Sequence, residues 1–414
     1  MSHAAPARPS FSAVLRVREF RALWLADIQS LVGDQLARVA LSVLVFERTS
    51  SALATAAVYS LTFLPALFGT PLGVLADRLP RRALLVGGDA IRAVLLAVMA
   101  LPGLPLGAVT VLLFAAVLVG APWKAAESAL VADILAEEGY VLGSGLRMAT
   151  SQASQLAGFA VGGTVVAAVG PHSALAIDAA TFGLSALILR FAILARPPVH
   201  EQHETGSGWT TGISVVLRSH RLRVLVGYAW LVAAFVVPEG LAAPYAAEVG
   251  GGARSVGLLL ASAPAGTLVA SLLFVRLVPA RVRARSVPWL AVATGLPLVA
   301  CAARPGLALT MLLWAVSGAL MTYQVQVMTE FVTSTPAGVR GQAIAFAASG
   351  LLAAQGLGVL IGGAVTAVAS APIVVAGAGA AGSTLALIIS ALDARAPRDH
   401  VVASRAANRS PAPR

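Results

Sequence analysis

The sequence predicts an all-α integral membrane protein with twelve transmembrane helices in two six-helix, pseudo-symmetric bundles. Of its 414 residues, 58% are hydrophobic and only 11% are charged, whereas about a quarter of a soluble domain is charged. Apolar runs of about 20 residues, the length that a helix needs to cross a bilayer, recur along the chain. A glycine-rich stretch of the first half also recurs 200 residues later. These observations exclude a single soluble core.

Pro, Gly and Arg residues separate the apolar runs and mark the ends of the predicted helices. The runs are continuous and rich in Ala, Leu, Val and Gly, which is typical of closely packed membrane helices and not of alternating barrel strands. The twelve predicted spans are residues 22–46, 54–76, 83–102, 107–131, 143–169, 174–195, 222–243, 255–277, 287–303, 307–332, 343–368 and 373–392.

The distribution of positive charge predicts that both ends of the chain are cytoplasmic, because cytoplasmic loops accumulate Arg and Lys. With that topology, 23 of the 29 basic residues lie in inner segments or at adjoining span ends, three lie in outer loops and three within spans. The net charge of +11 therefore reflects membrane topology, and we expect no nucleic-acid partner. The composition, rich in Arg and Ala with almost no Lys, favours a GC-rich bacterial source. We expect the protein in the bacterial inner membrane.

A polar break near the middle divides the spans into six and six. We expect a cytoplasmic tail at residues 1–21, an N-terminal bundle at 22–195, a cytoplasmic linker at 196–221, a C-terminal bundle at 222–392 and a cytoplasmic tail at 393–414. The run from Gln155 to Gly163 recurs as Gln355 to Gly363, in the fifth span of each half. Such a repeat is typical of transporters whose substrate site lies between the halves, near the membrane midplane.

The composition argues against enzymes and redox proteins. The single cysteine, Cys301, excludes a disulfide framework, and the sole lysine, Lys124, is not part of a nucleotide-binding phosphate loop. The spans contain no cluster of metal-ligating residues, so we expect no metal and no other cofactor. All six histidines lie outside the predicted spans, which leaves carboxylates as the carriers of any proton.

The loop after the second span reads Gly73-Val-Leu-Ala-Asp77-Arg78-Leu-Pro80-Arg81-Arg82. It resembles the signature loop of the major facilitator superfamily, G-x-x-x-D-R-x-G-R-R, with proline in place of the second glycine. Gly73 would let two helices approach, and Asp77 could accept hydrogen bonds from a facing helix N-terminus and from arginine, as a latch that breaks and re-forms. A topology signal without a mechanical role is the alternative.

Further motifs resemble one branch of that superfamily, the macrolide-efflux and enterobactin-exporter-like antiporters. They extend over about residues 20–390 and include Phe20-Arg-Ala-Leu-Trp24, Ser30-Leu-Val-Gly33-Asp34, Thr49-Ser-Ser-Ala52, Leu64-Pro65, Asp89-x-x-Arg92 and Pro336-Ala-Gly-Val-Arg340-Gly341-Gln342. The resemblance implies the major facilitator fold and proton-driven efflux of amphipathic small molecules. Many antiporters carry G-P-x-x-G-G in the fifth span, whereas this chain reads Gly158-Phe159-x-x-Gly162-Gly163.

Charged residues within the spans are the candidates for proton coupling, because a charge at the bilayer centre costs a few kcal/mol unless it is paired or faces water. Asp27, Asp34 and Arg38 share one stripe of the first span, with Asp34 about 18 Å deep. Asp34 would exchange a proton under the influence of Arg38, one turn away; a permanent Asp34–Arg38 salt bridge is the alternative. Asp178 and Glu239 are either second protonation sites or residues of the outer rim.

Two further sets of residues belong to the expected conformational machinery. Asp89 and Arg92, one turn apart in the third span, would brace the latch loop. Asp133 would face Arg82 or Arg340, beside Gly341, as part of a mirrored inner latch. The small-residue spacing of the repeat allows tight helix contacts, which we expect between the two halves, for packing or for gating, at Gly158, Gly162, Gly163, Gly358, Gly362 and Gly363.

Uncharged polar side chains within the spans are the candidates for substrate binding: Gln155, Trp230, Tyr323, Gln324 and Gln355. Amides and aromatic rings suit a large amphipathic ligand better than an anion, which would require converging arginines. Hydrogen bonding between helices is the alternative for each of them. Lys124 and Glu127 come late in the fourth span, where we expect the lysine to extend to the membrane interface.

These features predict a monomeric secondary transporter that exports hydrophobic or amphipathic small molecules in exchange for protons by alternating access. We expect the lipid bilayer, protons and a small amphipathic substrate as partners, and no enzymatic activity. An importer or lipid-handling facilitator of the same fold is one alternative, because the span-five proline is absent. A membrane sensor or scaffold without transport is another, although the polar segments are too short to fold alone as a soluble domain.

Overall fold

The computed structural model describes residues 11–63, 79–135, 137–196 and 210–395, and these residues contain helices and turns but no β-strand. The N-terminal half consists of α1 (Phe11–Arg16), α2 (Arg18–Thr49), α3 (Ala52–Ser60), α5 (Arg81–Met99), α6 (Leu106–Ile134) and α7 (Glu137–Ala192). The C-terminal half consists of α8 (Thr210–Arg218), α9 (His220–Trp230), α10 (Val232–Phe235), α11 (Val237–Gly240), α12 (Ala242–Glu248), α13 (Ala253–Leu277), α14 (Ala280–Thr294), α15 (Leu296–Val299), η2 (Ala300–Ala303), α16 (Leu307–Leu320), α17 (Tyr323–Ser334), η3 (Ala337–Val339), α18 (Arg340–Val365) and α19 (Ala371–Arg395).

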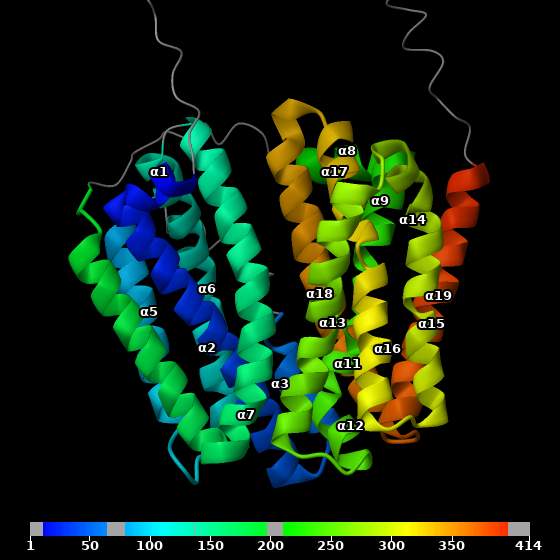
Figure 1. Cartoon of the computed structure of the whole chain (residues 1–414), viewed down its shortest axis with the longest axis horizontal. Helices are drawn as coiled ribbons and strands as arrows, with labels where there is room; N and C mark the ends of the chain where they lie inside the picture. The colour runs from blue at the N-terminus through cyan, green and yellow to red at the C-terminus, as the bar shows by residue number, and fades with distance from the viewer. Residues whose placement is uncertain (1–10, 64–78, 136, 197–209, 396–414) are drawn as a thin grey trace, which may run out of the picture.

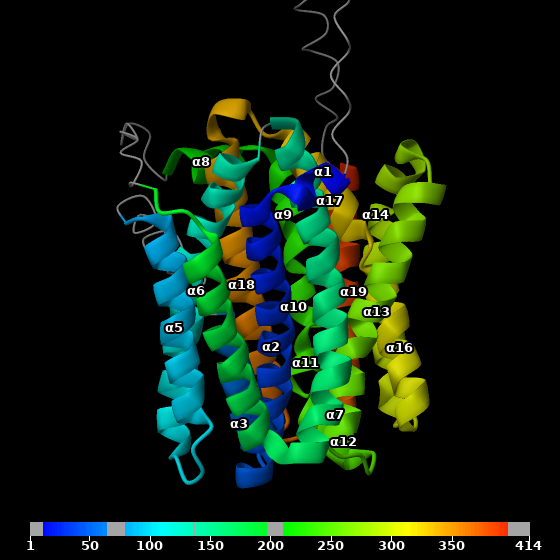
Figure 2. The same cartoon turned by 60° about the vertical axis from the view of Figure 1, so that its left-hand side comes forward.

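The two halves stand side by side as separate helix bundles (Figure 1). Helix α1 and the C-terminal end of α19 lie at the same end of the molecule, which we call the inner end (Figures 1 and 2). Helix α12 lies at the opposite, outer end. The distribution of positive charge predicts that the inner end is cytoplasmic.

Nine helices in the described ranges are long and apolar enough to cross a membrane. One of them, Gly139–Ala192, changes direction at Gly170, whose φ of +80° ends one helix just before Pro171 begins the next. It therefore supplies the predicted fifth and sixth spans. The predicted third span is α5, which is less apolar because four of its 19 residues are charged. Most of the second span beyond α3 lies outside the described residues, so twelve crossings remain a prediction.

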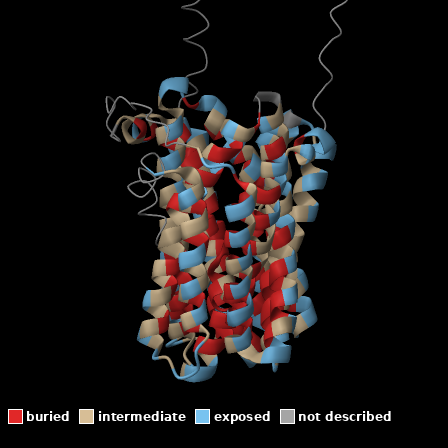
Figure 3. Cartoon of the chain, turned by 90° about the vertical axis from the view of Figure 1, so that its left-hand side faces the viewer, coloured by how far each residue is buried: buried red, intermediate tan, exposed pale blue. Residues whose placement is uncertain are grey.

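Large apolar side chains cover the lateral surface of the molecule. Val111 of α6 is 67% exposed, Phe191 of α7 79% and Trp289 of α14 77%. Figure 3 shows exposed residues on the outward faces of the helices and buried residues between them. Exposed apolar surface on this scale is unfavourable in water and is what a bilayer covers. The structure thus agrees with the predicted membrane protein.

Two of the repeat glycines pack the fifth span against the first span within the N-terminal half. A Cβ atom on Gly158 would lie 2.9 Å from the carbonyl oxygen of Val32, and one on Gly162 would lie 3.1 Å from the Cα atom of Leu36. Both contacted residues belong to α2. Because a side chain at either position would crowd the backbone of α2, the glycines allow α2 and α7 to approach closely.

The C-terminal half repeats this packing. Gly358 faces Ala233 of α10, and Gly362 faces Val237 of α11. The contacted residues follow their counterparts on α2 by 201 positions, so the internal repeat of the sequence extends to the contacts that it makes. The expectation that all six repeat glycines lie between the halves is therefore wrong for these four, which join helices of the same half.

The other two repeat glycines lie between the halves, as expected. A Cβ atom on Gly163 of α7 would lie 2.7 Å from the Cα atom of Gly257 of α13. A Cβ atom on Gly363 of α18 would meet Ala56 and would lie 3.3 Å from the Cα atom of Leu53, both on α3. Helix α7 packs along α13, and α3 packs along α18. The halves are therefore joined by two related pairs of helices.

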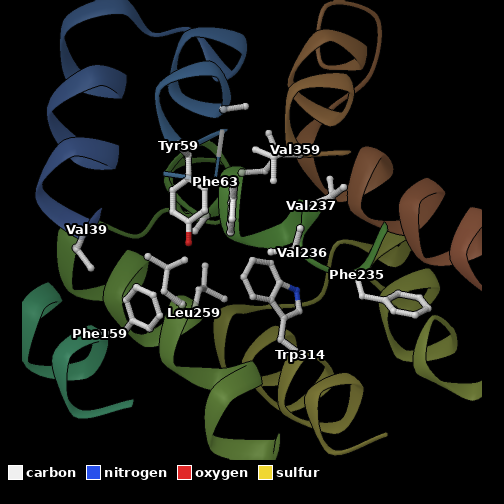
Figure 4. Packing of buried hydrophobic residues seen from close by; sticks show 14 of the residues in the cluster. Val39, Tyr59, Phe63, Phe159, Phe235, Val236, Val237, Leu259, Trp314 and Val359 are labelled. Atoms are coloured by element: carbon white, nitrogen blue, oxygen red, sulfur yellow. The ribbon is translucent and has the colours of Figure 1, made fainter. Parts of the chain in front are cut away.

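Apolar side chains from both halves fill the space between these two pairs of helices (Figure 4). Tyr59 and Phe159 come from the N-terminal half, and Leu259 and Val359 from the C-terminal half. The buried residues of α13 lie in its outer part, within Ser255–Ser262, whereas its inner part is partly or fully exposed. The halves are thus closed against each other at the outer end.

Gly163→Ala tests this closure. The added methyl group would lie 2.7 Å from the Cα atom of Gly257, which is closer than real Cβ contacts, so the halves must shift apart. We expect a loss of about 1–3 kcal/mol in the free energy of unfolding, seen as a lower thermal midpoint of the purified protein. Gly183→Ala is the control, because nothing lies within 4 Å of a Cβ atom there. Equal midpoints for the two variants would contradict the close contact.

Candidate functional site

A cavity of about 300 Å³ lies within the N-terminal half, among α2, α5, α6 and α7. Three acids and three bases line it, and this balance lowers the cost of holding charges in a membrane interior. The structure therefore brings together the predicted coupling residues of the first and sixth spans. The six charged residues are Asp27, Asp34, Arg38, Arg92, Lys124 and Asp178.

Asp34 pairs with an arginine of a neighbouring helix. Arg92 of α5 donates a hydrogen bond of 2.8 Å from Nη2 to Oδ1 of Asp34. The guanidinium carbon also lies 3.9 Å from the centre of the Phe182 ring. The Asp34 side chain remains 36% exposed, whereas that of Arg92 is 12% exposed. The alternative of a permanent Asp34–Arg38 salt bridge is wrong, and Arg92, expected to brace the latch loop, pairs with the candidate coupling acid Asp34 instead.

Arg38 turns toward the second span and the other half. Its guanidinium lies 5.9 Å from the centre of the Phe63 ring, and it interacts electrostatically with Tyr59 and Glu239. The hydroxyl of Tyr59, on α3, donates a hydrogen bond of 2.9 Å to Oε2 of Glu239, on α11. This bond crosses from the N-terminal to the C-terminal half. Glu239 therefore lies at the junction of the halves and not at the outer rim.

Asp178 is fully buried in the cavity wall, against α2. It fits there because Gly33 has no side chain; a Cβ atom at that position would collide with the Asp178 carboxylate. Oδ1 accepts a hydrogen bond of 3.1 Å from Thr181, whereas Oδ2 has no partner among the described residues. A buried, unpaired carboxylate oxygen is costly. Asp178 thus lies beside Asp34, away from the outer rim, and can accept a proton or a second donor.

Asp27 belongs to a second group of charges, closer to the inner end than Asp34. The side chains of Asp27 and Glu127 are 5% and 0% exposed. Nζ of Lys124 lies 3.6 Å from Oδ1 of Asp27 and 3.3 Å from Oε2 of Glu127. Arg147 of α7 lies 3.7 Å from Asp27, from Nε to Oδ2, and forms an ion pair with Glu127. We call these residues the four-charge cluster; Lys124, expected at the interface, lines the cavity instead.

The described part of the signature loop makes contacts within the N-terminal half. Arg81 forms an ion pair with Asp133, and Arg82 donates a hydrogen bond to the backbone carbonyl of Arg190. Asp133 thus meets Arg81 and not Arg82 or Arg340, which corrects the expected partner. Three predicted latch residues lie outside the described residues: Gly73, Asp77 and Arg78.

The remaining predicted latch residues also have partners in their own half. Nη2 of Arg340 donates a hydrogen bond of 3.2 Å to the carbonyl oxygen of Thr335, at the end of α17. Gly341 is exposed, with nothing within 4 Å of a Cβ atom. Asp89 is fully buried and accepts a hydrogen bond of 2.5 Å from Ser185, which ties α5 to the sixth span. These contacts support structural roles within each half.

Ion pairs at the inner end also have both partners in the same half. Arg196 binds Glu19 at 2.6 Å, from Nη2 to Oε2, and joins the start of the first span to the end of the sixth. Arg221 lies 3.6 Å from Asp393, from Nη1 to Oδ2, and joins the seventh span to the twelfth. Across the described ranges, each ion pair lies within one half, whereas the Tyr59–Glu239 bond crosses between the halves nearer the outer end.

Three of the predicted substrate-binding residues meet at the break where α9 ends. Gln324 donates a hydrogen bond of 3.0 Å from Nε2 to the carbonyl oxygen of Tyr228, and the buried Tyr323 donates one of 3.3 Å to the same atom. Trp230 donates one of 3.0 Å to the carbonyl oxygen of Ala347. The first two bonds satisfy the Tyr228 carbonyl near the end of α9, and the third ties α9 to the middle of α18, so the three side chains connect helices.

The two other predicted substrate residues, Gln155 and Gln355, are half-buried on α7 and α18 and do not line the cavity. Gln324 does line a second pocket, of about 310 Å³, whose lining residues come from α9, α17 and α18. Its lining in the described part of the chain is otherwise apolar. We call this space the apolar pocket.

Sequence patterns alone did not reveal Tyr59, Phe182 and Arg147 as members of the site. Tyr59 and Phe182 resemble any aromatic residue of an apolar span, and Arg147 lies near a predicted inner end, where the topology rule already explains a positive charge. Their roles depend on contacts between different helices, such as that of Tyr59 with Glu239, and a single sequence carries no signal for such contacts.

Comparisons with known proteins agree with this architecture. The family model of the Major Facilitator Superfamily matches residues 23–239, more than half of the chain. The multidrug efflux pump Tap of Mycobacterium tuberculosis is 30% identical over 367 residues, which cover 82% of this chain and 85% of that protein. The protein of the same name from Mycobacterium bovis matches equally well.

Solved structures share the fold at low identity. A POT family transporter in complex with a thioalcohol conjugated peptide matches with a TM-score of 0.73 and 12% identity, covering 91% of this chain and 96% of that chain. The nucleoside transporter NupG matches with a TM-score of 0.68 and 15% identity, covering 91% and 99%. A bacterial homolog to human lysosomal transporter Spinster matches with a TM-score of 0.66 and 14% identity, covering 93% and 97%. From its helical architecture, the family match and the 30% identical relative, the chain belongs to the major facilitator superfamily.

Proposed function

We propose that this chain is a secondary transporter of the bacterial inner membrane that exports amphipathic small molecules in exchange for protons. The Asp34–Arg92 pair in the cavity wall is the observation that carries the proposal. The similarity to a multidrug efflux pump supports the direction of transport and the class of substrate. The chain works as a monomer with both termini in the cytoplasm, and it catalyses no covalent reaction.

The pair can couple a proton to movement because Arg92 has a possible partner on the sixth span besides Asp34 on the first. In this conformation Arg92 binds Asp34, and it also interacts electrostatically with the buried Asp178. A proton on Asp34 removes the charge that holds Arg92 there. The arginine then turns to Asp178, whose Oδ2 lacks a hydrogen-bond partner in the described ranges. Protonation therefore changes which helices the guanidinium joins, from α2 and α5 to α5 and the sixth span.

Export requires the outer closure to open. Opening breaks the Tyr59–Glu239 hydrogen bond and separates Gly163 from Gly257. Arg38 connects this closure to the proton site, because it lies one turn from Asp34 on α2 and acts on Glu239 across the junction. A change of charge at Asp34 alters the electrostatic field at Arg38, and so biases the closure. This is the physical link between proton binding and alternating access.

Asp34→Asn tests the proton site. An amide cannot lose a proton, so we expect the uptake of a fluorescent amphipathic dye into inverted vesicles, driven by an acidic interior, to fall by about tenfold or more. Dye exchange without a gradient continues, because the amide still accepts a hydrogen bond from Arg92.

Glu47→Gln is the matched control, because Glu47 is an exposed acid at the outer end of the same helix. Unchanged gradient-driven uptake in Asp34→Asn would refute the proton site. Uptake of the dye by whole cells that make the protein, in place of its export, would refute the direction and favour an importer.

Tyr59→Phe tests the junction between the halves. The loss of a hydrogen bond worth about 0.5–1.5 kcal/mol should raise the outward-open population about two- to tenfold. Spin labels on cysteines that replace Glu47 and Arg254, in a Cys301→Ser background, report the distance between the outer ends by electron resonance. Tyr228→Phe is the control, because Tyr228 binds Ser390 within the C-terminal half. A distance distribution that is the same in both variants would show that the Tyr59 hydrogen bond does not hold the outer ends together.

A further inference from the structure

The internal repeat places two chemically different sites at equivalent positions in the two halves. The four-charge cluster lies on the first, fourth and fifth spans, and the apolar pocket lies on the seventh, tenth and eleventh spans. Members of the two sites are related by the 200-residue displacement of the repeat. The pairs are Lys124 with Gln324, Glu127 with Val327, and Arg147 with Ala347.

The contacts of the two sites correspond as well. Lys124 reaches Asp27 on the first span, at 3.6 Å, and Gln324 reaches the carbonyl oxygen of Tyr228 on the seventh span, at 3.0 Å. Asp27 and Tyr228 are 201 positions apart, the same displacement as that of the glycine contacts. The two sites therefore occupy one position of the shared architecture, charged in one half and apolar in the other.

The apolar pocket suits an uncharged group. Its volume is about 310 Å³, and its walls include Val226, Val327, Phe331 and Ile344. The one amide at its edge, Gln324, already donates its hydrogen bonds to backbone carbonyls. A charged ligand group would find no opposite charge among the lining residues that the structure describes and would lose its hydration, which is unfavourable. An alkyl chain or an aromatic ring would gain the free energy of leaving water.

Lys124 is the one member of the four-charge cluster that can leave. Its side chain is 56% exposed, whereas that of Arg147 is 14% exposed and the two acids are buried. Two buried carboxylates need two cations, because a buried carboxylate without a partner is strongly destabilising. Lysine has a flexible stem and a single charged atom, so another cation can replace it. Asp27 lines the cavity and is within reach of such a cation.

We propose that the four-charge cluster and the apolar pocket form one split substrate site for amphipathic cations. The cationic group of the ligand takes the place of Lys124 at Asp27, while its apolar part enters the pocket of the other half. Trp123, whose ring already lies 5.7 Å from Nζ of Lys124, supports the incoming cation. Both sites lie on the inner side of the outer closure. This assignment rests on the proposed transport function and adds the substrate class and the place of each ligand group.

Binding of alkyltrimethylammonium ions with six to twelve carbons tests the charged part of the site. Binding is measured on the purified protein in lipid nanodiscs at pH 8, with partition into empty nanodiscs subtracted. In Lys124→Met no built-in cation competes with the ligand, so we expect binding to be about tenfold tighter. Arg254→Met removes an exposed positive charge at the outer end and should leave the affinity unchanged. Equal or weaker binding by Lys124→Met would refute the proposal that the cationic group of the ligand replaces Lys124 at Asp27.

The dependence of affinity on alkyl length tests the apolar part. In the wild type each added methylene should tighten binding by about fourfold until the pocket is full. Ala348→Trp fills the pocket from the exposed side of α18, so the affinity should no longer rise with chain length. Leu357→Trp, on the exposed face of the same helix, is the matched control and should keep the wild-type dependence. An unaltered dependence of affinity on chain length in Ala348→Trp would refute the binding of the alkyl chain in the apolar pocket.

These measurements use no proton gradient, so they separate this inference from the proposed function. If the binding effects appear but a gradient drives no transport, the split site stands and the antiport proposal falls. If a gradient drives transport but neither variant alters binding as described, the antiport proposal stands and the split site is refuted.

Discussion

The cost of an unpaired charge within a membrane governs how the N-terminal half is built. Asp34 and Arg92 lie on different helices, yet each is the partner that makes the other tolerable in an apolar environment. The same constraint explains why Asp27 and Glu127, both buried, share Lys124 and Arg147. Apart from Lys124–Glu127 within α6, these pairings join helices that the hydrophobic effect alone would not orient, because lipid is as apolar as the helix surfaces. Charge pairing therefore sets which faces of these helices point inward.

The C-terminal half has the same helix packing without these charges. The contacts that Gly158 and Gly162 make with the first span recur as the contacts that Gly358 and Gly362 make with the seventh span. Backbone approach thus depends on small residues that both halves share, while the side chains around it are free to differ. The proposed transport mechanism depends on this combination of shared helix packing and different side chains. The charged residues of the cavity all belong to the N-terminal half, whereas the C-terminal half contributes Glu239 at the junction and the apolar pocket.

The sequence identified Asp34 as a candidate because depth in a span follows from helical rise, and a charge at that depth persists only if it is paired or faces water. It did not identify Arg92 as the partner. The rule for residues one turn apart favours Arg38, but a salt bridge forms with whichever cation the packing of helices brings closest, and α5 brings Arg92. For the same reason the spacing of the six repeat glycines indicated close contacts without showing that four of them lie within the halves.

The sequence by itself determined the membrane class, the approximate spans, the expected topology and the twofold repeat. These features depend on local hydrophobicity, on charge counts and on self-similarity, all of which are properties of consecutive residues. Tertiary structure alone decided which charges pair, that Tyr59 meets Glu239, and that charged and apolar sites occupy equivalent places. The physical reason is that a helix presents several faces, and a single sequence does not state which neighbour covers each one.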